Sequence, residues 1–311
     1  MKRTFTQIAS LWKEDKRKYV KTASYAVYLQ LCNVYILPVF GARTAFADDD
    51  VQAFAEKLLA DGYALKTVKD TVLVLKMILR FGEKLKAWPH VDVSVRYPAT
   101  ADSGHTIATL SLQQQRRLLA YLHAHFSFRN LGLQICLQSG LRIGEICGLQ
   151  WKDLDVAAGV IKVRKTVQRI YLADGESKAY FLSIDTPKTA TSVRDIPLSA
   201  ELKALLRPFK KVVDPECYLL SNAIDPMEPS AYRAYFYHLL KVLGIPPVRF
   251  HALRHSFATR CIENRCDYKT VSAILGHASI STTLDLYVHP GYKEKKQVID
   301  RMAKALSASC K

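Results

Sequence analysis

The 311-residue chain lacks any pair of cysteines at CxxC spacing. Its seven cysteines are an odd and scattered set, at positions 32, 136, 147, 217, 261, 266 and 310. Such a set fits neither the disulfide framework of a small secreted domain nor a cysteine-based zinc site. It predicts reduced thiols in a cytoplasmic protein.

No apolar run in the sequence suggests a membrane span. Thr71–Leu79 is among the longest such runs, but Lys76 interrupts it and it falls far short of the roughly 20 residues that a spanning helix needs. The N-terminus, from Met1 to Phe5, leads into charged residues rather than into an apolar signal core. These absences predict a protein that is neither secreted nor held in a membrane.

Basic residues, by contrast, are in clear excess. The chain carries 45 Lys and Arg against 28 Asp and Glu, a net charge of +17. Residues 1–97 hold 16 of these basic and 10 of these acidic groups, so both parts of the chain are basic. General solubility is one explanation of the excess. A polyanion such as double-stranded DNA, held from two sides, fits the even distribution better.

The length of the chain suits two domains. Within residues 1–97, four amphipathic stretches between residues 5 and 88 predict a small helical bundle, and we expect Pro38 to end its second helix. A basic group around the end of the first helix is expected to be either a solvated face or a contact to the DNA backbone. Its members are Lys13, Lys16, Arg17, Lys18 and Lys21.

Residues 98–109 lack hydrophobic periodicity and are expected to form a linker. Residues 110–311, with a tail at 290–311, combine helical periodicity with three β-branched stretches. These stretches lie at 160–163, 180–184 and 193–198. The turn sequence between the last two places Lys188 on a predicted hairpin loop. The expected fold is mainly α with a small antiparallel sheet, an α+β domain that follows an N-terminal helical bundle.

Four groups suited to phosphate chemistry stand near the C-terminus: His251, Arg254, His277 and Tyr287. They fall within 37 residues. A guanidinium holds the charge of a reacting phosphodiester with always-ionised donors in a fixed fork. A free phenol has a pKa of about 10, so attack by Tyr287 at neutral pH needs a base such as imidazole. This chemistry needs no metal and no cofactor.

A zinc site is the main alternative for the histidines. His251 and His255 are four residues apart, the spacing of a helical zinc pair. However, Ala252 stands where a metalloprotease would carry its general-base Glu, and no third ligand has suitable spacing. We therefore expect no metal, and we assign His255 a structural or supporting place.

Four patches between about residues 110 and 290 carry a resemblance to a known family. They are Ser139-Gly140-Leu141-Arg142-Ile143-Gly144-Glu145 with Leu149 and Trp151; Thr186-Pro187-Lys188-Thr189 with Arg194-Asp195-Ile196-Pro197-Leu198; Phe250-His251-Ala252-Leu253-Arg254-His255-Ser256-Phe257-Ala258-Thr259; and Ile274-Leu275-Gly276-His277 through Ser281-Thr282-Thr283 to Tyr287. In order and spacing the patches resemble tyrosine recombinases of the phage and conjugative-transposon integrase type. Residues 1–97 match the helical core-type DNA-binding domain of that family in size only.

The resemblance implies that residues 110–311 form the catalytic domain of a DNA strand transferase. Tyr287 would be the nucleophile and would form a 3′-phosphotyrosyl intermediate. Arg142 and Arg254 would hold the reacting phosphate. Because the energy of the DNA bond is stored in the intermediate, rejoining would need no ATP.

The resemblance also assigns the proton transfers. His251 would take the Tyr287 proton as general base, or would hydrogen-bond the phosphate, and His277 would be the other phosphate donor or base. Lys188 would protonate the leaving 5′-oxygen. Glu145 would orient Arg142 or the histidines.

By the same resemblance, the partners are double-stranded DNA and three further copies of the chain, in a homotetramer on two DNA sites. The segment Tyr292–Leu306 is expected to form a helix that docks on a neighbouring protomer or folds back on its own domain. An accessory DNA-bending or excisionase protein and a place at the nucleoid, in the bacterial cytoplasm, also follow from the resemblance.

The biological task stays open at this point. Integration and excision of a mobile element are favoured, while inversion and resolution remain. Two other classes of protein are alternatives: a type IB topoisomerase-like enzyme that relaxes DNA, and a catalytically silent DNA-binding regulator.

Overall fold

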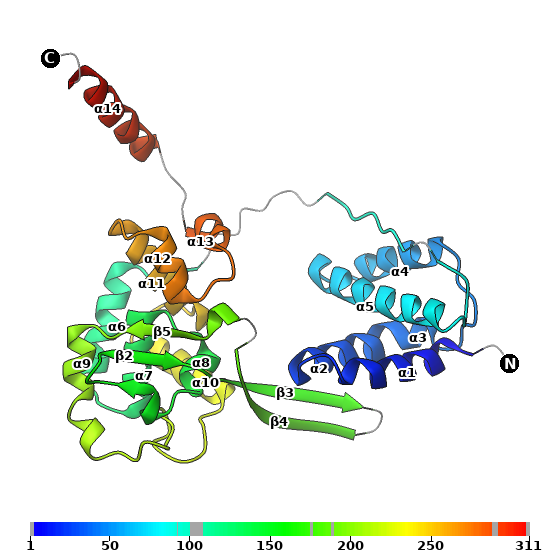
Figure 1. Cartoon of the computed structure of the whole chain (residues 1–311), viewed down its shortest axis with the longest axis horizontal. Helices are drawn as coiled ribbons and strands as arrows, with labels where there is room; N and C mark the ends of the chain where they lie inside the picture. The colour runs from blue at the N-terminus through cyan, green and yellow to red at the C-terminus, as the bar shows by residue number, and fades with distance from the viewer. Residues whose placement is uncertain are drawn as a thin grey trace. The chain divides into compact units, whose positions relative to one another are not determined.

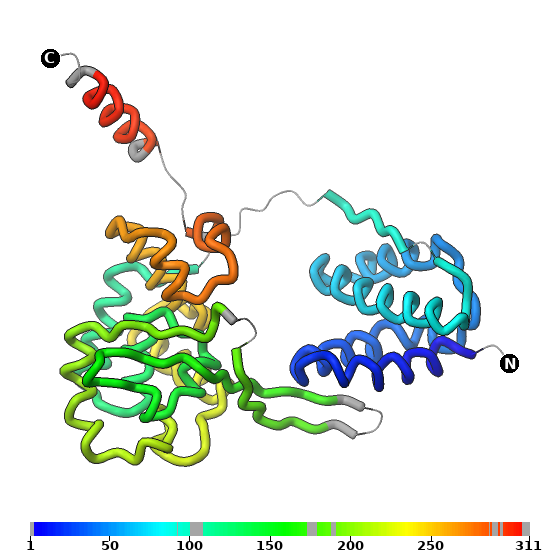
Figure 2. Tube along the Cα trace, viewed as in Figure 1, coloured from blue at the N-terminus to red at the C-terminus, as the bar shows by residue number. Residues whose placement is uncertain are grey.

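The computed structural model describes residues 3–91, 93–99, 108–174, 177–187, 190–287 and 292–308. The chain forms two compact units, as the trace in Figures 1 and 2 allows the reader to follow. One unit comprises Met1–Gly104 with Arg169–Leu182, and the other comprises His105–Gln168 with Ser183–Lys311. Each unit is described by itself below.

The first unit is built around a helical bundle. Its elements are α1 (Phe5–Arg17), α2 (Thr22–Leu31), a π-helical turn (Cys32–Ile36), α3 (Leu37–Phe40), α4 (Asp49–Ala60) and α5 (Leu65–Lys84). Thr4 caps α1, because its hydroxyl accepts a bond from the Gln7 N–H while the Gln7 side chain accepts one from the Thr4 N–H. The bundle core is apolar and rich in aromatic side chains. It includes Phe5, Trp12, Phe40, Phe54, Leu75, Ile78 and Trp88.

The prediction that Pro38 ends the second helix is wrong. The Leu37 N–H donates to the Cys32 carbonyl five residues back, which forms the π-helical turn. Pro38 then lies in the first turn of α3. A proline is tolerated in a first turn, because its missing N–H would have no partner within the helix there. The helical path therefore continues to Phe40 and stops before Gly41.

The combined helix Thr22–Phe40 is long and apolar enough to cross a membrane by length and composition alone. The expectation that no apolar run reaches that length is corrected here, because it overlooked this segment. Cys32, Ile36 and Phe40 are at most 1% exposed and pack in the bundle core. A core helix of a soluble protein passes the same test, and these buried side chains favour that reading.

A three-stranded antiparallel sheet lies among the helices of the second unit (Figure 1). Its strands β1 (Leu154–Asp155), β2 (Val160–Val163) and β5 (Arg194–Pro197) run in the order β1-β2-β5. Val163 is opposite Arg194 in the β2–β5 pair. β3 (Thr166–Asp174) and β4 (Ser177–Asp185) form a separate two-stranded sheet.

The predicted hairpin between the second and third β-branched stretches is wrong. β4 pairs with β3, and β5 pairs with β2, so the segment that contains Lys188 connects two different sheets. The prediction missed strand β3, which ends at Asp174 just before a glycine. An Asp-Gly pair between alternating stretches is a strong hairpin signal, and it would have pointed to the β3–β4 pairing.

The rest of the second unit is largely helical, as its periodicity predicts. Its helices are α6 (Leu112–Ala124), α7 (Phe128–Ser139), α8 (Ile143–Cys147), α9 (Ala200–Leu206), α10 (Pro229–Val242), α11 (His251–Glu263), α12 (Tyr268–Leu275), α13 (Ile280–Tyr287) and α14 (Tyr292–Ala308). A capping box of Ser111 and Gln114 opens α6. The mainly α fold with small antiparallel sheets is therefore confirmed.

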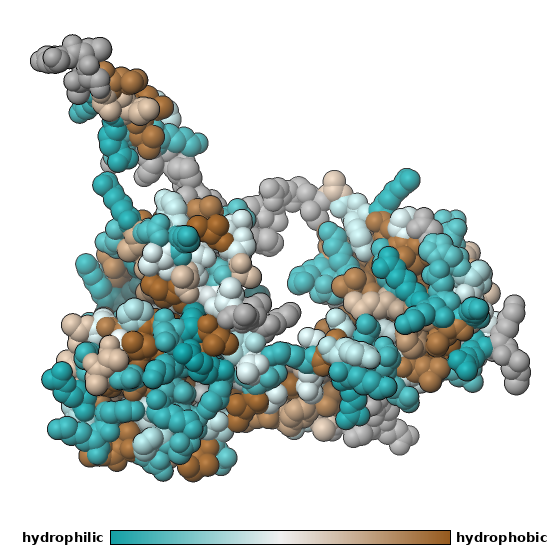
Figure 3. Space-filling model, viewed as in Figure 1, coloured by the Kyte–Doolittle hydropathy of each residue, from teal (hydrophilic) through white to brown (hydrophobic). Residues whose placement is uncertain are grey.

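The tail helix α14 exposes an apolar face, which shows as brown side chains on that helix in Figure 3. Val298, Ile299, Met302 and Leu306 are each 56–68% exposed. Their spacing places them on one side of the helix. The expected tail helix is thus present, and its docking partner stays a prediction.

Candidate active site

Side chains from distant parts of the sequence meet at one site in the second unit. They come from the start of α8, strand β5, the first turn of α11, the end of α12 and the last turn of α13. The site residues are Arg142, Glu145, Arg194, His251, Arg254, His255, His277 and Tyr287. Direct contacts join these elements, since Arg142 Nη2 donates to the Gly276 carbonyl at 3.3 Å. Six of the predicted site residues are therefore brought together.

Glu145 is a buried anion that holds two arginines. Its side chain is 3% exposed, and Oε1 accepts a hydrogen bond from Arg142 Nη1 at 2.7 Å. Arg194 contacts both carboxylate oxygens, at 3.1 and 3.0 Å. Burial acts to raise the pKa of Glu145, but hydrogen bonding and the charges of Arg194 and Arg142 outweigh it and hold that pKa below its ordinary value. The carboxylate thus stays ionised at neutral pH and fixes both guanidiniums.

Arg194 is a site residue that the sequence prediction leaves out. Besides Glu145, it contacts the Ile274 carbonyl through Nε at 2.5 Å and the Ser192 carbonyl through Nη1 at 3.0 Å. It therefore ties strand β5 to the end of α12. Its side chain is buried, at an inward-facing position of the β5 alternation. A charged residue at an inward position was the signal that could have revealed this role, because buried charges are normally paired.

Arg254 is almost completely buried, with 1% of its surface exposed. Its Nη1 donates to the Gly140 carbonyl at 3.0 Å, and its Nη2 has no hydrogen-bond partner among the described residues. Burial, followed by the nearby Arg142, lowers the pKa of Arg254 to about 9, which still leaves the guanidinium charged at neutral pH. A buried, charged donor without a partner is costly, and an anion would satisfy it.

His277 follows a left-handed glycine at the end of α12. Gly276 has φ +67°, and a Cβ there would stand 3.0 Å from the Arg194 side chain and from the Thr191 carbonyl. The backbone therefore needs glycine at this position. His277 Nδ1 is 2.8 Å from Thr283 Oγ1. Desolvation, followed by the charges of Arg254 and Arg142, lowers the pKa of His277 to about 4, so the ring is neutral at pH 7.

The structure places His255, rather than His251, against the phenol. His255 Nδ1 lies 2.6 Å from Tyr287 Oη, and the His251 ring packs edge-on against His255 with centroids 4.6 Å apart. The structural or supporting place expected for His255 stays a prediction, and the contact puts it next to the phenol. Desolvation, then His255 and Arg254, lowers the pKa of His251 to about 4.

Tyr287 lies within reach of the arginines. Burial raises the pKa of its phenol above the ordinary value, while the positive charges of Arg254 and Arg142 act in the opposite direction. The ring packs partly buried against a small apolar cluster of Ala258, Val271 and Leu275. The phenol is therefore held close to the two cations that would attract a phosphate.

A cavity of about 380 Å³ opens at the arginine side of the site. Arg142, Glu145 and His277 line it together with Thr166 and Pro187, among others. Lys188, the next residue of the sequence, lies outside the described residues. The cavity is large enough for a phosphate group, and its lining carries the charges that such a group needs.

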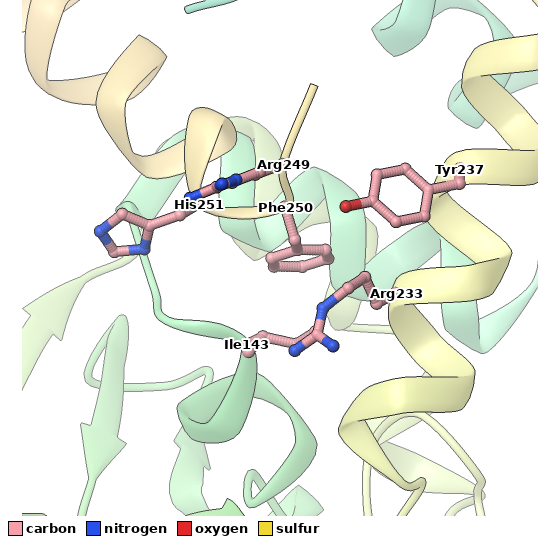
Figure 4. A pocket seen from close by; sticks show the side chains of 6 residues that line it. All are labelled: Ile143, Arg233, Tyr237, Arg249, Phe250 and His251. Carbon is pink, nitrogen blue, oxygen red and sulfur yellow. The ribbon is translucent and has the colours of Figure 1, made fainter. Parts of the chain in front are cut away.

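A second cavity of about 380 Å³ borders His251 (Figure 4). Its cationic lining comes from Arg233 of α10 and Arg249, which precedes α11, and the Tyr237 hydroxyl points toward the same space. Ile143 and the buried ring of Phe250 form its floor. Both cavities thus border the predicted phosphate site.

The basic group of the first unit is partly exposed. Lys13 Nζ donates to Asn33 Oδ1 at 2.7 Å. Arg17, Lys18 and Lys21 are exposed on and after the end of α1.

Within the described ranges, no three His, Cys, Asp or Glu side chains lie close enough together to form a metal site.

Comparison with known sequences decides the family. A profile described as the phage integrase family matches residues 108–294, which is more than half of the chain. The chain belongs to this family. It is a tyrosine recombinase of the integrase type and, as such, a DNA strand transferase.

Several relatives of this recombinase are curated proteins. It is 27% identical to a XerC-like tyrosine recombinase of Caldanaerobacter subterraneus, over 81% of this chain and 69% of the relative. It is also 27% identical to the transposase of transposon Tn916 from Enterococcus faecalis, over 82% of this chain and 66% of the relative. The ICEBs1 integrase of Bacillus subtilis is 28% identical over 54% of this chain and 46% of the relative. The chain thus spans about half to two thirds of the length of these relatives.

Solved structures share the fold. The Tn1549 transposon integrase bound to transposon right end DNA matches with a TM-score of 0.75 at 23% identity, over 97% of this chain and all of that chain. The lambda integrase bound to DNA matches with a TM-score of 0.62 at 16% identity, over 89% and 94%. The integrase fold therefore extends over both units of this recombinase.

Proposed function

We propose that this recombinase integrates and excises a mobile DNA element by cutting and rejoining double-stranded DNA through Tyr287. The observation that carries this proposal is a phenol that contacts His255 and is acted on by the charges of two arginines, one of which is buried with a donor that has no partner among the described residues. Such a site binds a phosphate and presents a nucleophile to it. The mobile-element relatives, the Tn916 transposase and the ICEBs1 integrase, support the choice of task.

The phosphate grip is assigned to Arg142, Arg254 and His277. In transfer, negative charge develops on the non-bridging oxygens of the phosphodiester. Arg142 is aimed by Glu145, and Arg254 is fixed by the Gly140 carbonyl, so both can meet that charge without rearrangement. His277 would add a neutral hydrogen-bond donor on the side of α12.

Tyr287 would attack the phosphorus, and the 5′-oxygen would leave. Lys188 is proposed as the acid that protonates this oxygen, on the resemblance of its sequence patch to the family. A substrate with a 5′-bridging sulfur needs no such acid, because a thiolate is a good leaving group. Lys188→Ala should therefore cleave the sulfur substrate much faster than ordinary DNA. Equal, slow cleavage of both substrates would remove Lys188 from this role.

Duplex DNA would be held on both sides of the reacting phosphate. The second cavity, with Arg233, Arg249 and Tyr237, suits a neighbouring phosphate of the same backbone. Each lost phosphate contact should lower the slope of log affinity against log salt by about 0.9. The double variant Arg233→Gln, Arg249→Gln should show this change in a salt titration, and Arg207→Gln, an exposed arginine at the end of α9, serves as its control.

The domain roles follow from this arrangement. We assign residues 1–97 to a core-type DNA-binding domain, residues 98–109 to a linker and residues 110–311 to the catalytic domain. Within the basic group at the end of α1, Arg17, Lys18 and Lys21 are exposed, and we assign them to contacts with the DNA backbone. The net charge of +17 supports binding of a polyanion by both domains.

Assembly is proposed as four protomers on two DNA sites. A lambda integrase tetramer bound to a Holliday junction shares the fold. The exposed apolar face of α14 supports docking of the tail on a neighbouring protomer. An excisionase or DNA-bending partner and a location at the nucleoid belong to the same proposal. Truncation after residue 290 should abolish tetramers on DNA, as measured by sedimentation, and retained tetramers would count against docking.

The experiment that tests the function uses a nicked suicide substrate, on which cleavage releases a short strand and traps the protein on DNA. The unaltered chain should form a covalent adduct that survives denaturing gels. Tyr287→Phe should bind the same DNA with similar affinity and form no adduct. Tyr292→Phe, five residues on at the start of α14, is the matched control and should behave like the parent.

A further inference from the structure

The contact between Tyr287 and His255 bears on the first step of the reaction. The phenol oxygen and His255 Nδ1 are 2.6 Å apart, which is a short hydrogen bond. The phenol can donate to a ring nitrogen or accept from one, so the tautomer of His255 sets the direction of this bond. In the neutral tautomer with its proton on Nε2, His255 Nδ1 accepts the phenol O–H and is a base already hydrogen-bonded to the nucleophile.

The surroundings keep this imidazole neutral. Desolvation, followed by the charge of Arg254, lowers the pKa of His255 below its ordinary value. The titratable and charged groups that face it are Tyr287 from α13 and His251 and Arg254 from its own helix. At neutral pH His255 is thus mainly uncharged, as a proton acceptor must be.

His251 is less well placed to act on the phenol. The His251 ring packs against the His255 ring, and it is His255 that contacts the phenol oxygen. His251 also borders the second cavity, beside Arg249 and Arg233 (Figure 4). That position suits a hydrogen bond to a phosphate of the DNA backbone.

We infer that His255 is the general base that takes the proton of Tyr287 when the phenol attacks DNA. The inference rests on the proposed function, because it presupposes Tyr287 as the nucleophile. It assigns a catalytic residue that the family patches do not single out.

The atoms balance in this step. The Tyr287 O–H bond breaks, and the proton goes to His255 Nδ1 while the phenol oxygen forms a bond to phosphorus. The bond from phosphorus to the 5′-oxygen breaks, and that oxygen takes a proton from an acid. On rejoining, the 5′-hydroxyl returns its proton to the conjugate base of that acid and attacks phosphorus, while the tyrosyl oxygen leaves and takes its proton back from His255. No oxidant, reductant or metal is consumed.

The test compares His255→Gln with the parent in single-turnover cleavage of the suicide substrate across pH. Gln can still accept a hydrogen bond from the phenol but does not take up a proton in this range. We expect cleavage to fall by about 10²- to 10⁴-fold, the usual range for loss of a general base. His238→Gln, an exposed histidine of α10, is the control and should cleave at the parental rate.

The shape of the pH profile separates a base from a packing residue. Above the pKa of His255, the parent should cleave at a rate that changes little with pH. His255→Gln should instead become about tenfold faster per pH unit toward the phenol pKa, because solvent must then generate the phenolate. A variant that keeps the flat parental profile, or the parental rate, would overturn the inference.

A more acidic phenol supplies an independent readout. With difluorotyrosine incorporated at position 287, loss of the base should matter less, so the defect of His255→Gln should shrink. An undiminished defect would contradict proton transfer to His255. Tyr287→Phe separates a failure of the proposed function from a failure of this inference. A covalent adduct with Tyr287→Phe would contradict the proposed function. Parental cleavage by His255→Gln, together with no adduct from Tyr287→Phe, would contradict only this inference.

Discussion

The two sides of the active site are built differently. On one side, Glu145 holds Arg142 and Arg194 in buried ion pairs, and Arg254 is anchored to the Gly140 carbonyl. On the other side, the partly buried Tyr287 meets the site through one hydrogen bond to His255. The phosphate grip is thus fixed by several buried contacts, whereas the nucleophile depends on few. A fixed grip matches electrostatic preorganisation, in which donors are in place before charge develops.

Among changes on the phosphate-binding side of the site, Glu145→Ala should have the largest effect on stability. This change leaves the buried Arg194 without its counter-ion, and removal of one partner of a buried pair costs about 3–5 kcal/mol of stability. Urea unfolding should show this loss. Glu216→Ala, which breaks the exposed pair with Lys152, should cost much less, because solvent screens an exposed ion pair. Equal losses in the two variants would contradict the central place of Glu145.

Arg254→Lys separates charge from geometry on the same side. Lys keeps a positive charge but loses the planar fork of donors. We expect DNA cleavage to slow by about 10²- to 10³-fold, the scale of losing one preorganised donor in a transition state. Arg260→Lys, at a partly exposed arginine of the same helix that pairs with Glu263, should leave single-turnover cleavage near the parental rate.

Gly276→Ala tests how closely α12 must approach the arginines. The left-handed φ and the close contact to Arg194 both oppose a side chain there, and we expect a loss of about 1–3 kcal/mol. Gly62→Ala is the matched control, because Gly62 also has a positive φ but no atom within 4 Å of an added Cβ. A larger loss at Gly276, with slower cleavage, would confirm the contact. Identical behaviour of the two variants would refute it.

The pKa values of two histidines predict a smaller, pH-dependent effect on the stability of the folded chain. The pKa values of His251 and His277 are both about 4 in the folded chain and ordinarily near 6.5. Between these values the unfolded chain binds more protons, so stability should fall as the pH drops from about 6.5 to 4. In urea unfolding, the double variant His251→Gln, His277→Gln should depend less on pH over that range. An unchanged slope would mean that these histidines do not carry the effect.

Sequence reasoning located most of the site because its local signals are strong. The helix starts, the left-handed glycine before His277 and the spacing of His251 and Arg254 are all visible in the chain, and the structure brings Arg142, Glu145, His277 and Tyr287 to the same place. Arg194 and His255 escaped, because their roles depend on tertiary contacts to Glu145 and Tyr287. Strand β3 was not predicted, because the stretch that forms β4 was paired with the stretch that forms β5.

Mass spectrometry of the covalent protein–DNA adduct identifies the nucleophile itself. The covalent protein–DNA adduct from the suicide substrate can be trimmed with nuclease, digested with protease and analysed by mass spectrometry. The account predicts a nucleotide joined through its 3′-phosphate to the peptide that carries Tyr287, and to no other peptide. A nucleotide on a peptide with any of the other 15 tyrosines, or on a serine, would contradict it.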